Sequence, residues 1–150
     1  MTTTLGYDTV HRTPTRDFSC FVVDETGRLL LVRRGWAGLW SHPLDGQAAR
    51  GEPMGRAIAR LGGAQLALPL ANAVCVLPST STSPPVYLAE VGLAEPDPDL
   101  SRLVAHRWVD PEELGRAVVV APWALSPALV THVRRLADVD PVGLSLELAG

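Results

Sequence analysis

The chain has 150 residues, 47% of them apolar, so it is long enough to bury a core within one domain. Its net charge of −3 argues against general nucleic-acid binding, which needs a basic surface. No lysine occurs, and all thirteen basic residues are arginines, which excludes Schiff-base chemistry and a lysine–phosphate contact. Cys20 and Cys75 lie in apolar runs and are expected to be reduced core residues, which predicts a cytoplasmic protein.

The first third of the sequence predicts a hairpin followed by a loop. Residues 17–24 are β-branched and aromatic, which is typical of a strand. Residues 28–34 form its partner across a Gly-containing turn at 25–27. Residues 35–51 predict a loop rich in Gly and Trp, with a short strand near 41–46.

The middle of the chain predicts one helix and two strands. The helix opens at Glu52-Pro53, where Pro occupies a tolerated first-turn position. It is expected to stop at Gly62-Gly63, a strong termination signal. Strands are predicted over 69–78 and 85–93, joined by an exposed loop of Ser, Thr and Pro.

The last third predicts one strand and two helices. The strand covers 103–109, and Asp110 then caps a short helix over Pro-Glu-Glu-Leu. Residues 124–138 carry apolar side chains at helical spacing, and the final twelve residues predict a loose tail. The order of these elements indicates a mixed sheet with helices on both faces.

Residues 46–60 carry a recognisable motif. The letters GQAARGE, followed by seven residues and Arg60, fit the opening of a Nudix box, G-x5-E-x7-R. The flanking segments FSCFVVDETGRLLLVRR, GLW, HRWVDPEEL and PWALSP occur in the order seen in type 1 isopentenyl-diphosphate isomerases. Over about residues 11–135 the chain therefore resembles this branch of the Nudix fold. The resemblance implies an α+β fold, a Nudix-like mixed β-sheet sandwiched between helices. It also implies a single domain over 1–150, with a core at about 11–138.

The sequence departs from the family where the resemblance places the metal site. The family holds a divalent metal with His and Glu ligands. The positions that align with family ligands are Thr15, Gln47, Ala64, Gln65 and Thr82. None of these carries the anionic oxygen that Mg²⁺ prefers. We therefore expect the protein to use no metal and no other cofactor.

Asp45 aligns with the cysteine through which the family moves a proton. Two interpretations are open. Asp45 is either a turn residue in an Asp-Gly pair, or a carboxylic acid, kept neutral by apolar burial, that protonates an alkene or an epoxide. His42 is a candidate to orient Asp45, although an extended loop would put the two side chains on opposite faces. His106 is a further catalytic candidate, with a core or surface histidine as the alternative.

Other charged residues have one structural and one functional interpretation each. His132, on the last helix, is expected to be exposed. Glu52 is either a surviving Nudix carboxylate or a residue that only serves the helix start, and Glu90 is either buried or solvent-facing. Strand alternation points only one of Arg33 and Arg34 toward a pocket, where it would meet an anion; surface arginines are the alternative.

Aromatic residues are the expected surroundings of a carbocation, because cation–π attraction strengthens on desolvation. Ala128 stands where the resemblance implies a pocket Trp, a change that enlarges a pocket by roughly the area of an aromatic side chain, 150–250 Å². Ordinary core packing is the alternative for each residue. The predicted substrate-binding residues are Phe18, Trp36, Trp40, Tyr87, Trp108, Trp123 and Ala128.

These residues favour a metal-independent, isomerase-like enzyme that protonates an isoprenoid and directs rearrangement or cyclisation of the cation. Such a protein is a terpene cyclase or a double-bond isomerase, and its expected substrate is an isoprenoid or meroterpenoid without diphosphate in the site. A non-catalytic Nudix-fold binding module is one alternative. A true isopentenyl-diphosphate isomerase or a Nudix hydrolase is another. We expect no nucleic-acid partner and no stable membrane insertion, because no run approaches the roughly 18 apolar residues of a span.

Overall fold

The computed structural model describes residues 15–34, 38–91 and 105–139. Within these ranges the chain forms six strands, three α-helices and a short 3-10 helix. In chain order they are β1 (Arg16–Val23), β2 (Leu29–Arg33), β3 (Leu44–Ala48), α1 (Met54–Leu66), β4 (Leu70–Leu77), β5 (Val86–Val91), β6 (Ala105–Val109), α2 (Pro111–Val120), η2 (Pro122–Ala124) and α3 (Pro127–Val139).

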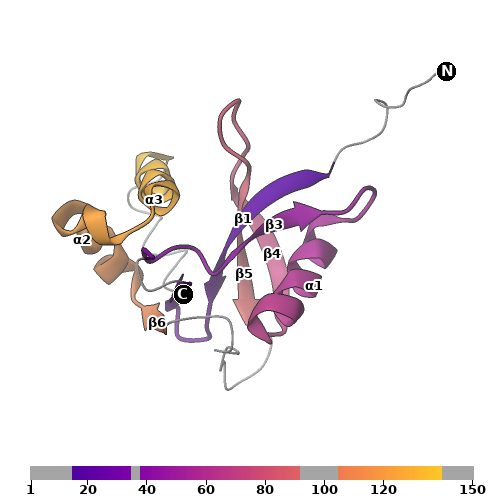
Figure 1. Ribbon diagram of the computed structural model, residues 1–150, viewed down its shortest axis with the longest axis horizontal. Coiled ribbons are helices and arrows are strands. Elements are labelled where there is room, and N and C mark those ends of the chain that lie inside the picture. The colour runs from indigo at the N-terminus through magenta and orange to yellow at the C-terminus, as the bar shows by residue number, and fades with distance from the viewer. Residues whose placement is uncertain (1–14, 35–37, 92–104, 140–150) are drawn as a thin grey trace.

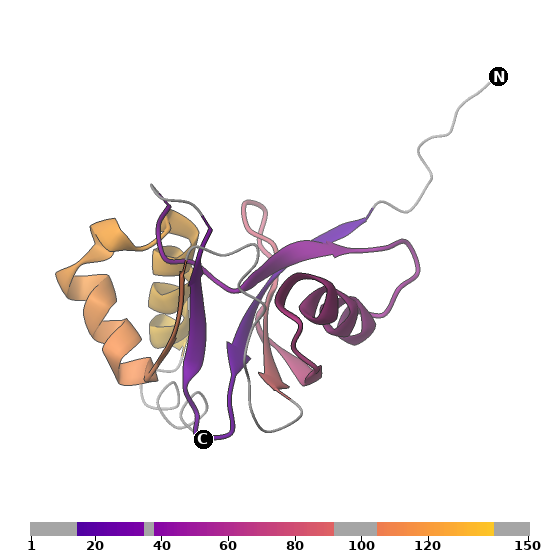
Figure 2. The same cartoon turned by 60° about the horizontal axis from the view of Figure 1, so that its bottom comes forward.

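These strands build one mixed sheet, and helices cover both of its faces. The strand order is β4-β5-β1-β2-β6, and β3 pairs with β1 beside this path. β1 and β5 run parallel, while the other pairs run antiparallel. α1 lies on one face of the sheet, and α2 and α3 lie on the other (Figures 1 and 2). The predicted α+β class, with a mixed sheet between helices, is confirmed.

β1 changes partners along its length, so β2 and β3 diverge from each other. We call the place where they diverge the fork. Its first half pairs with β3, whereas its last residue, Val23, pairs with Leu29 at the start of β2. After β2 the chain turns back, and Ser41 forms an isolated antiparallel bridge with Val32 of β2. The chain then pairs with β1 as β3. His42 and Pro43 therefore cross the fork between β2 and β3.

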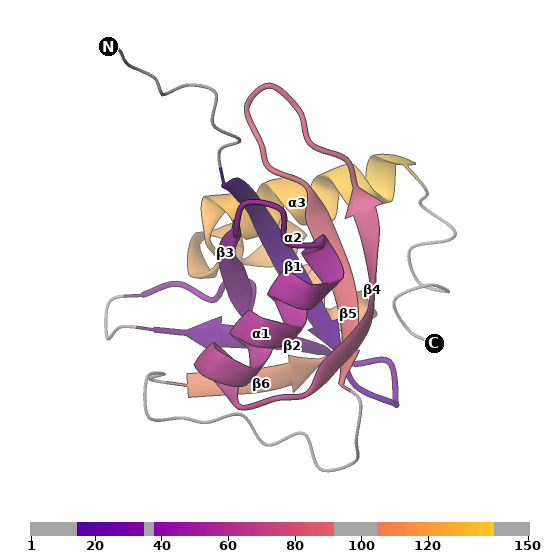
Figure 3. The same ribbon diagram turned by 90° about the vertical axis from the view of Figure 1, so that its right-hand side faces the viewer.

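Alternation along the strands divides the interior into two cores. On β1, Phe18, Cys20 and Val22 belong to the core beneath α1. Phe21 and Val23 belong to the core beneath α2 and α3. Figure 3 looks onto the α1 face, with α3 behind the sheet. The position of a residue along its strand thus decides which core it faces.

The first helix is longer than predicted. The expected stop at Gly62-Gly63 is wrong, because α1 continues to Leu66 and ends where Ala67 adopts the left-handed conformation, with φ of 56°. Gly62 is buried, and an added Cβ there would lie 2.5 Å from Leu70 Cδ1. Gly62 therefore serves close packing of the helix on β4 rather than termination.

Other boundaries shift by a few residues. Asp110 occupies the N-cap position of α2, but its side chain makes no capping hydrogen bond, and α2 runs on to Val120. The short strand expected near 41–46 is β3. The last helix begins later than predicted because Pro122–Ala124 form η2. Apart from Val139, which ends α3, the predicted tail lies outside the described residues.

The two cysteines differ in burial. Cys20 is buried, as predicted, and both thiols are free. The prediction for Cys75 is wrong, because Cys75 is exposed on β4, which lies at the edge of the sheet. None of the described helices is long and apolar enough to cross a membrane.

The packing of α1 predicts different outcomes for two neighbouring glycines. Gly62→Ala would force a methyl group against buried Leu70, and such overpacking costs about 1–3 kcal/mol of unfolding free energy. The matched control is Gly63→Ala, where a methyl group meets nothing within 4 Å and should stabilise the helix by about 1 kcal/mol. Urea unfolding of the two variants measures the difference. Wild-type stability in Gly62→Ala would contradict the close contact.

Candidate functional site

Asp45 lies on β3 and is held by the neighbouring strand. The antiparallel register places Ser19 of β1 directly opposite Asp45. The Ser19 hydroxyl donates a hydrogen bond to Asp45 Oδ1 over 2.6 Å. Ser19 is buried, with 5% of its surface exposed, whereas Asp45 is exposed. Alternation puts both side chains on the face covered by α3. The apolar enclosure expected around Asp45 is not provided by the described residues.

A pair of buried histidines lies on the same face. His42, at the fork, and His132, on α3, are 1% and 3% exposed. His132 Nδ1 lies 2.8 Å from His42 Nε2, and His132 Nε2 lies 3.3 Å from the Ser83 hydroxyl oxygen. The His42 ring also packs on Phe21, with ring centroids 4.9 Å apart. The histidine pair thus joins the crossing segment at His42 to α3.

The charges around the histidine pair act on it in opposite directions. Burial lowers the pKa of His42 to about 4 and also lowers the pKa of His132. The Asp45 carboxylate raises the pKa of both rings, while Arg135 lowers that of His132. At neutral pH both imidazoles are therefore uncharged and share one hydrogen between them.

The structure brings His42 and His132 together, which sequence reasoning did not foresee. The expectation of an exposed His132 is wrong, because its ring turns inward to meet a residue 90 positions earlier in the chain. The expected placement of His42 and Asp45 on opposite faces is also wrong, although no hydrogen bond among the described residues joins the two side chains. His42 contacts Phe21 and His132 on the α3 side, because the chain crosses the fork at this point. The position of His132 beside the apolar face of its helix is the one sequence signal that could have predicted its burial.

His106 lies on the opposite face of the sheet. It pairs with Val32, which belongs to the core beneath α1. The structure therefore does not bring His106 to Asp45. Glu90 is exposed and accepts a hydrogen bond from the Asn72 side chain. Neither candidate makes a hydrogen bond or ion pair with Asp45 or the histidine pair among the described residues, since Glu90 bonds to Asn72 and His106 faces α1.

The predicted aromatic residues do not form one enclosure around Asp45. Phe18, Tyr87 and Trp108 face the core beneath α1, because strand alternation turns them away from α3. Trp123 is 75% exposed, and Ala128 is exposed near the start of α3. Trp36 lies outside the described residues.

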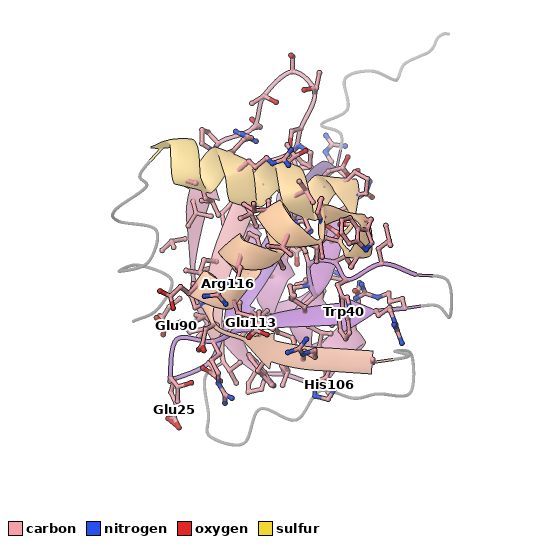
Figure 4. The ribbon with its side chains drawn as sticks, turned by 90° about the vertical axis from the view of Figure 1, so that its left-hand side faces the viewer. Glu25, Trp40, Glu90, His106, Glu113 and Arg116 are labelled. Carbon is pink, nitrogen blue, oxygen red and sulfur yellow. The ribbon has the colours of Figure 1, made fainter. Side chains whose placement is uncertain are left out.

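Trp40 is the predicted aromatic residue that lines a pocket on the α2 side. The pocket holds about 210 Å³ between α2 and the strands β2 and β6. Figure 4 looks onto this side of the molecule and labels Trp40 and, on α2, Glu113. Arg107 donates to Glu113 over 2.8 Å at the same pocket. Its other lining residues are Leu31, Val109, Leu114, Ala117, Ala121, Ala124 and Leu125.

Arg33 and Arg34 both make contacts within the chain. The Arg33 guanidinium lies over the Trp40 ring, 5.4 Å from its centroid. Arg34 is exposed and donates to the backbone carbonyl of Pro43 over 2.6 Å. Arg33 therefore contacts Trp40, and Arg34 contacts the backbone just before β3.

The remnant of the Nudix box forms a structural brace. The Arg60 guanidinium donates two hydrogen bonds, of 2.9 and 3.0 Å, to the Glu52 carboxylate. The Ala49 N–H donates to the same carboxylate over 2.8 Å, and Arg16 donates to the Glu52 backbone carbonyl. The structural interpretation of Glu52 is supported, since this Glu52–Arg60 brace fastens the β3–α1 loop to the helix.

The residues at the family's ligand positions do not fit a divalent metal. Gln47 donates its side-chain amide to Asp17 over 2.8 Å, and Ala64 offers no ligand atom. Thr82 lies at the turn of the β4–β5 hairpin. Among the described residues, no group of three or more His, Cys, Asp or Glu side chains is placed to hold a metal ion.

Solved structures define the class of this protein as the Nudix fold. A Deinococcus radiodurans protein matches with a TM-score of 0.62 and 20% identity, over 85% of this chain and 89% of its own. The MutT protein of Methanosarcina mazei Go1 matches with a TM-score of 0.60 and 17% identity, over 88% and 99%. A Nudix hydrolase family member of Chromobacterium violaceum matches with a TM-score of 0.57 and 17% identity, over 92% and 96%. No protein-family model matches the chain.

Closer relatives are isomerases. The isopentenyl-diphosphate Delta-isomerase of Frankia alni is 35% identical, over 89% of this chain and 77% of the relative. The enzyme of the same name from Brevibacterium linens is 33% identical, over 79% and 74%. The chain therefore belongs to the isopentenyl-diphosphate Delta-isomerase family.

The Glu52–Arg60 brace predicts a pH-dependent loss of stability. Its hydrogen bonds lower the pKa of Glu52 from the ordinary 4.5 to about 2. The brace therefore stabilises the fold above pH 4.5, and this stabilisation disappears as the pH falls toward 2. Glu52→Gln should lower the free energy of unfolding at pH 7 and match the wild type near pH 2.

Chemical denaturation across this pH range tests the brace. Glu25→Gln is the control, because Glu25 is an exposed carboxylate at the β1–β2 turn (Figure 4). It should leave the stability nearly unchanged at both pH values. A Glu52→Gln deficit that stays constant from pH 7 to pH 2 would contradict the ion pair.

Proposed function

We propose that the protein is a metal-independent enzyme that protonates an alkene or epoxide of an isoprenoid or meroterpenoid and directs the resulting rearrangement or cyclisation. Membership of the isomerase family supports isoprenoid chemistry. The observation that carries the proposal is the Ser19–Asp45 hydrogen bond, at the position where the resemblance places a proton-transferring cysteine. A carboxylic acid there can replace a thiol as a proton donor.

The proposed reaction begins when Asp45 gives its proton to the substrate. The O–H bond of the carboxylic acid breaks, a C–H bond forms at an alkene carbon, and a carbocation and a carboxylate result. In the epoxide case, the proton goes to the ring oxygen and a C–O bond opens. The Asp45 carboxylate then takes a proton from a carbon next to the cation, which forms a new double bond and regenerates the acid. The overall change therefore needs no oxidant or reductant. Ser19 fixes Oδ1, which leaves Oδ2 to carry the transferred hydrogen.

The substrate is expected to react at a carbon chain and not at a diphosphate. The chain has no lysine, and the residues at the family's metal-ligand positions do not fit Mg²⁺. An apolar substrate over exposed Asp45 would exclude the water that favours the charged carboxylate. Trp40, half-buried on the same side of the sheet, already holds the Arg33 guanidinium over one face of its ring, so a carbocation would meet the other face. Two free thiols are compatible with the proposed cytoplasmic location.

Removal of the transferable proton tests the role of Asp45. Asp45→Asn keeps the shape of the side chain, and turnover of an accepted prenylated substrate should fall by about 10²–10⁴-fold, while binding changes little. Asp45→Glu should keep part of the activity. The measurement is turnover over a panel of prenylated compounds, followed by mass spectrometry and NMR.

The matched control is Asp17→Asn, an exposed aspartate on β1 whose side chain faces the same way as Asp45. It should leave turnover close to that of the wild type. Full activity in Asp45→Asn would refute the proposed acid. Binding of prenylated compounds without any conversion would instead identify a binding module.

Two further assays separate this reaction from that of the named relatives. Activity should survive EDTA, because the residues at the ligand positions are unsuited to a divalent metal. Isopentenyl diphosphate should undergo no enzyme-like exchange of hydrogen for deuterium in D₂O. Activity that is lost in EDTA and restored by Mg²⁺ would contradict the metal-independent reaction, as would rapid deuteration of dimethylallyl diphosphate.

A further inference from the structure

The cavity beneath α2 is a feature that the proposed acid step does not use. We call it the α2 pocket, and it holds about 210 Å³. Leu31 of β2 and Val109 of β6 line it from the sheet, and Ala117, Ala121 and Ala124 line it from α2 and the segment that follows. Protein interiors are packed about as densely as organic crystals and leave few voids larger than a water molecule. A cavity of this size therefore needs a reason.

Small side chains leave the space open. Ala117 packs against the core beneath α2 and α3, yet its methyl group leaves room that a longer apolar side chain would fill. An unfilled cavity lowers the stability of a fold, because the atoms that line it have fewer neighbours to contact. Packing alone therefore gives no reason for alanine at three positions around one cavity.

The α2 pocket is apolar inside and charged at one side. Leu31, Leu114 and Leu125 are buried lining residues. Among the described residues that line it, the two charged ones are Arg107 and Glu113, whose ion pair spans 2.8 Å and whose side chains are 57% and 43% exposed. The ion pair therefore marks the side that meets solvent. A buried water needs several polar partners, which the leucines and alanines do not offer, so the inside suits an apolar group.

The volume of the α2 pocket limits the size of that group. An engineered apolar cavity of about 150 Å³ stays dry and binds benzene, which has six carbons. The α2 pocket, at about 210 Å³, has room for a branched group of similar size. One isoprene unit has five carbons and fits this space. Two units, with ten carbons, exceed it by the same comparison.

We propose that the α2 pocket binds the terminal isoprene unit of the substrate's prenyl chain. This inference rests on the proposed function, because that reaction supplies the isoprenoid. Trp40 lines the pocket and lies on the same side of the sheet as Asp45. A prenyl chain can therefore lie along this side, with its far end beneath α2 and its reacting carbon at Asp45. The pocket then determines which end of the chain is held away from the acid.

Binding to the α2 pocket can be measured without turnover. The probe is prenol, a five-carbon alcohol that ends in one isoprene unit, added to the full protein. A ligand that binds only the folded state raises Tm in a saturable way, and prenol should do so. In protein labelled with ¹³C at the alanine methyl groups, NMR signals of Ala117, Ala121 and Ala124 should move with prenol. The signal of Ala59, exposed on α1, should stay in place.

Filling the α2 pocket should remove the site. Ala117→Leu should weaken prenol binding by about tenfold or more, because the longer side chain occupies the space that the probe needs. Ala121→Val is a second variant that reduces the cavity from the end of α2, in case Ala117→Leu does not fold. The matched control is Ala59→Leu, which should bind prenol like the wild type.

The outcomes separate the pocket from the acid. Prenol that leaves Tm and the three alanine signals unchanged would overturn the proposal. Wild-type affinity in a folded Ala117→Leu or Ala121→Val protein would also overturn it. Asp45→Asn should bind prenol normally, because Asp45 does not line the pocket. If prenol binds as described while no prenylated compound is converted, the pocket stands and the proposed reaction fails.

Discussion

The hydrogen-bonded register between β1 and β3 is the constraint on which the site depends. It places Ser19 opposite Asp45 and fixes which side of the sheet both side chains face. The same strand must also pair with β2 at its far end, so β2 and β3 diverge. His42 lies in this divergence and is covered by His132 from α3. A slip of one residue in the register would turn Asp45 toward α1 and away from the histidine pair.

The residues that resemble a Nudix box differ in what they do in this structure. The Glu52–Arg60 ion pair persists and braces the β3–α1 loop, so it has a structural reason to remain. Ala64 and Gln65, at positions where the resemblance implies metal ligands, lie on the last turn of α1. The fold does not require a carboxylate at either position, because the Nudix fold of this chain forms without one. Proton transfer by a side chain is chemistry that the remaining scaffold can support.

The sequence was sufficient for features that depend on local pattern. Alternation and turn residues predicted the first hairpin. The resemblance carried by the motif at 46–60 and its flanking segments predicted the fold, and the alignment with the family's cysteine singled out Asp45. Features that depend on contacts distant in sequence were missed. In the sequence, Gly62 has the pattern of a helix end, and only its contact with Leu70 shows that it serves packing. In the sequence, His132 has the pattern of a surface residue, and only its contact with His42 shows that it is buried. Phe18 and Trp40 fall on opposite faces because pairing of the strands, and not composition, decides which way each ring points.

The most direct measurement of the central claim is the position of deuterium in the product formed in D₂O. The wild-type protein, incubated with an accepted alkene substrate in the presence of EDTA, is predicted to give a product with deuterium at the protonated carbon. The same incubation with Asp45→Asn is predicted to give almost no product. A product formed at the wild-type rate without carbon-bound deuterium would show that no proton from the protein initiates the reaction, and it would contradict the account.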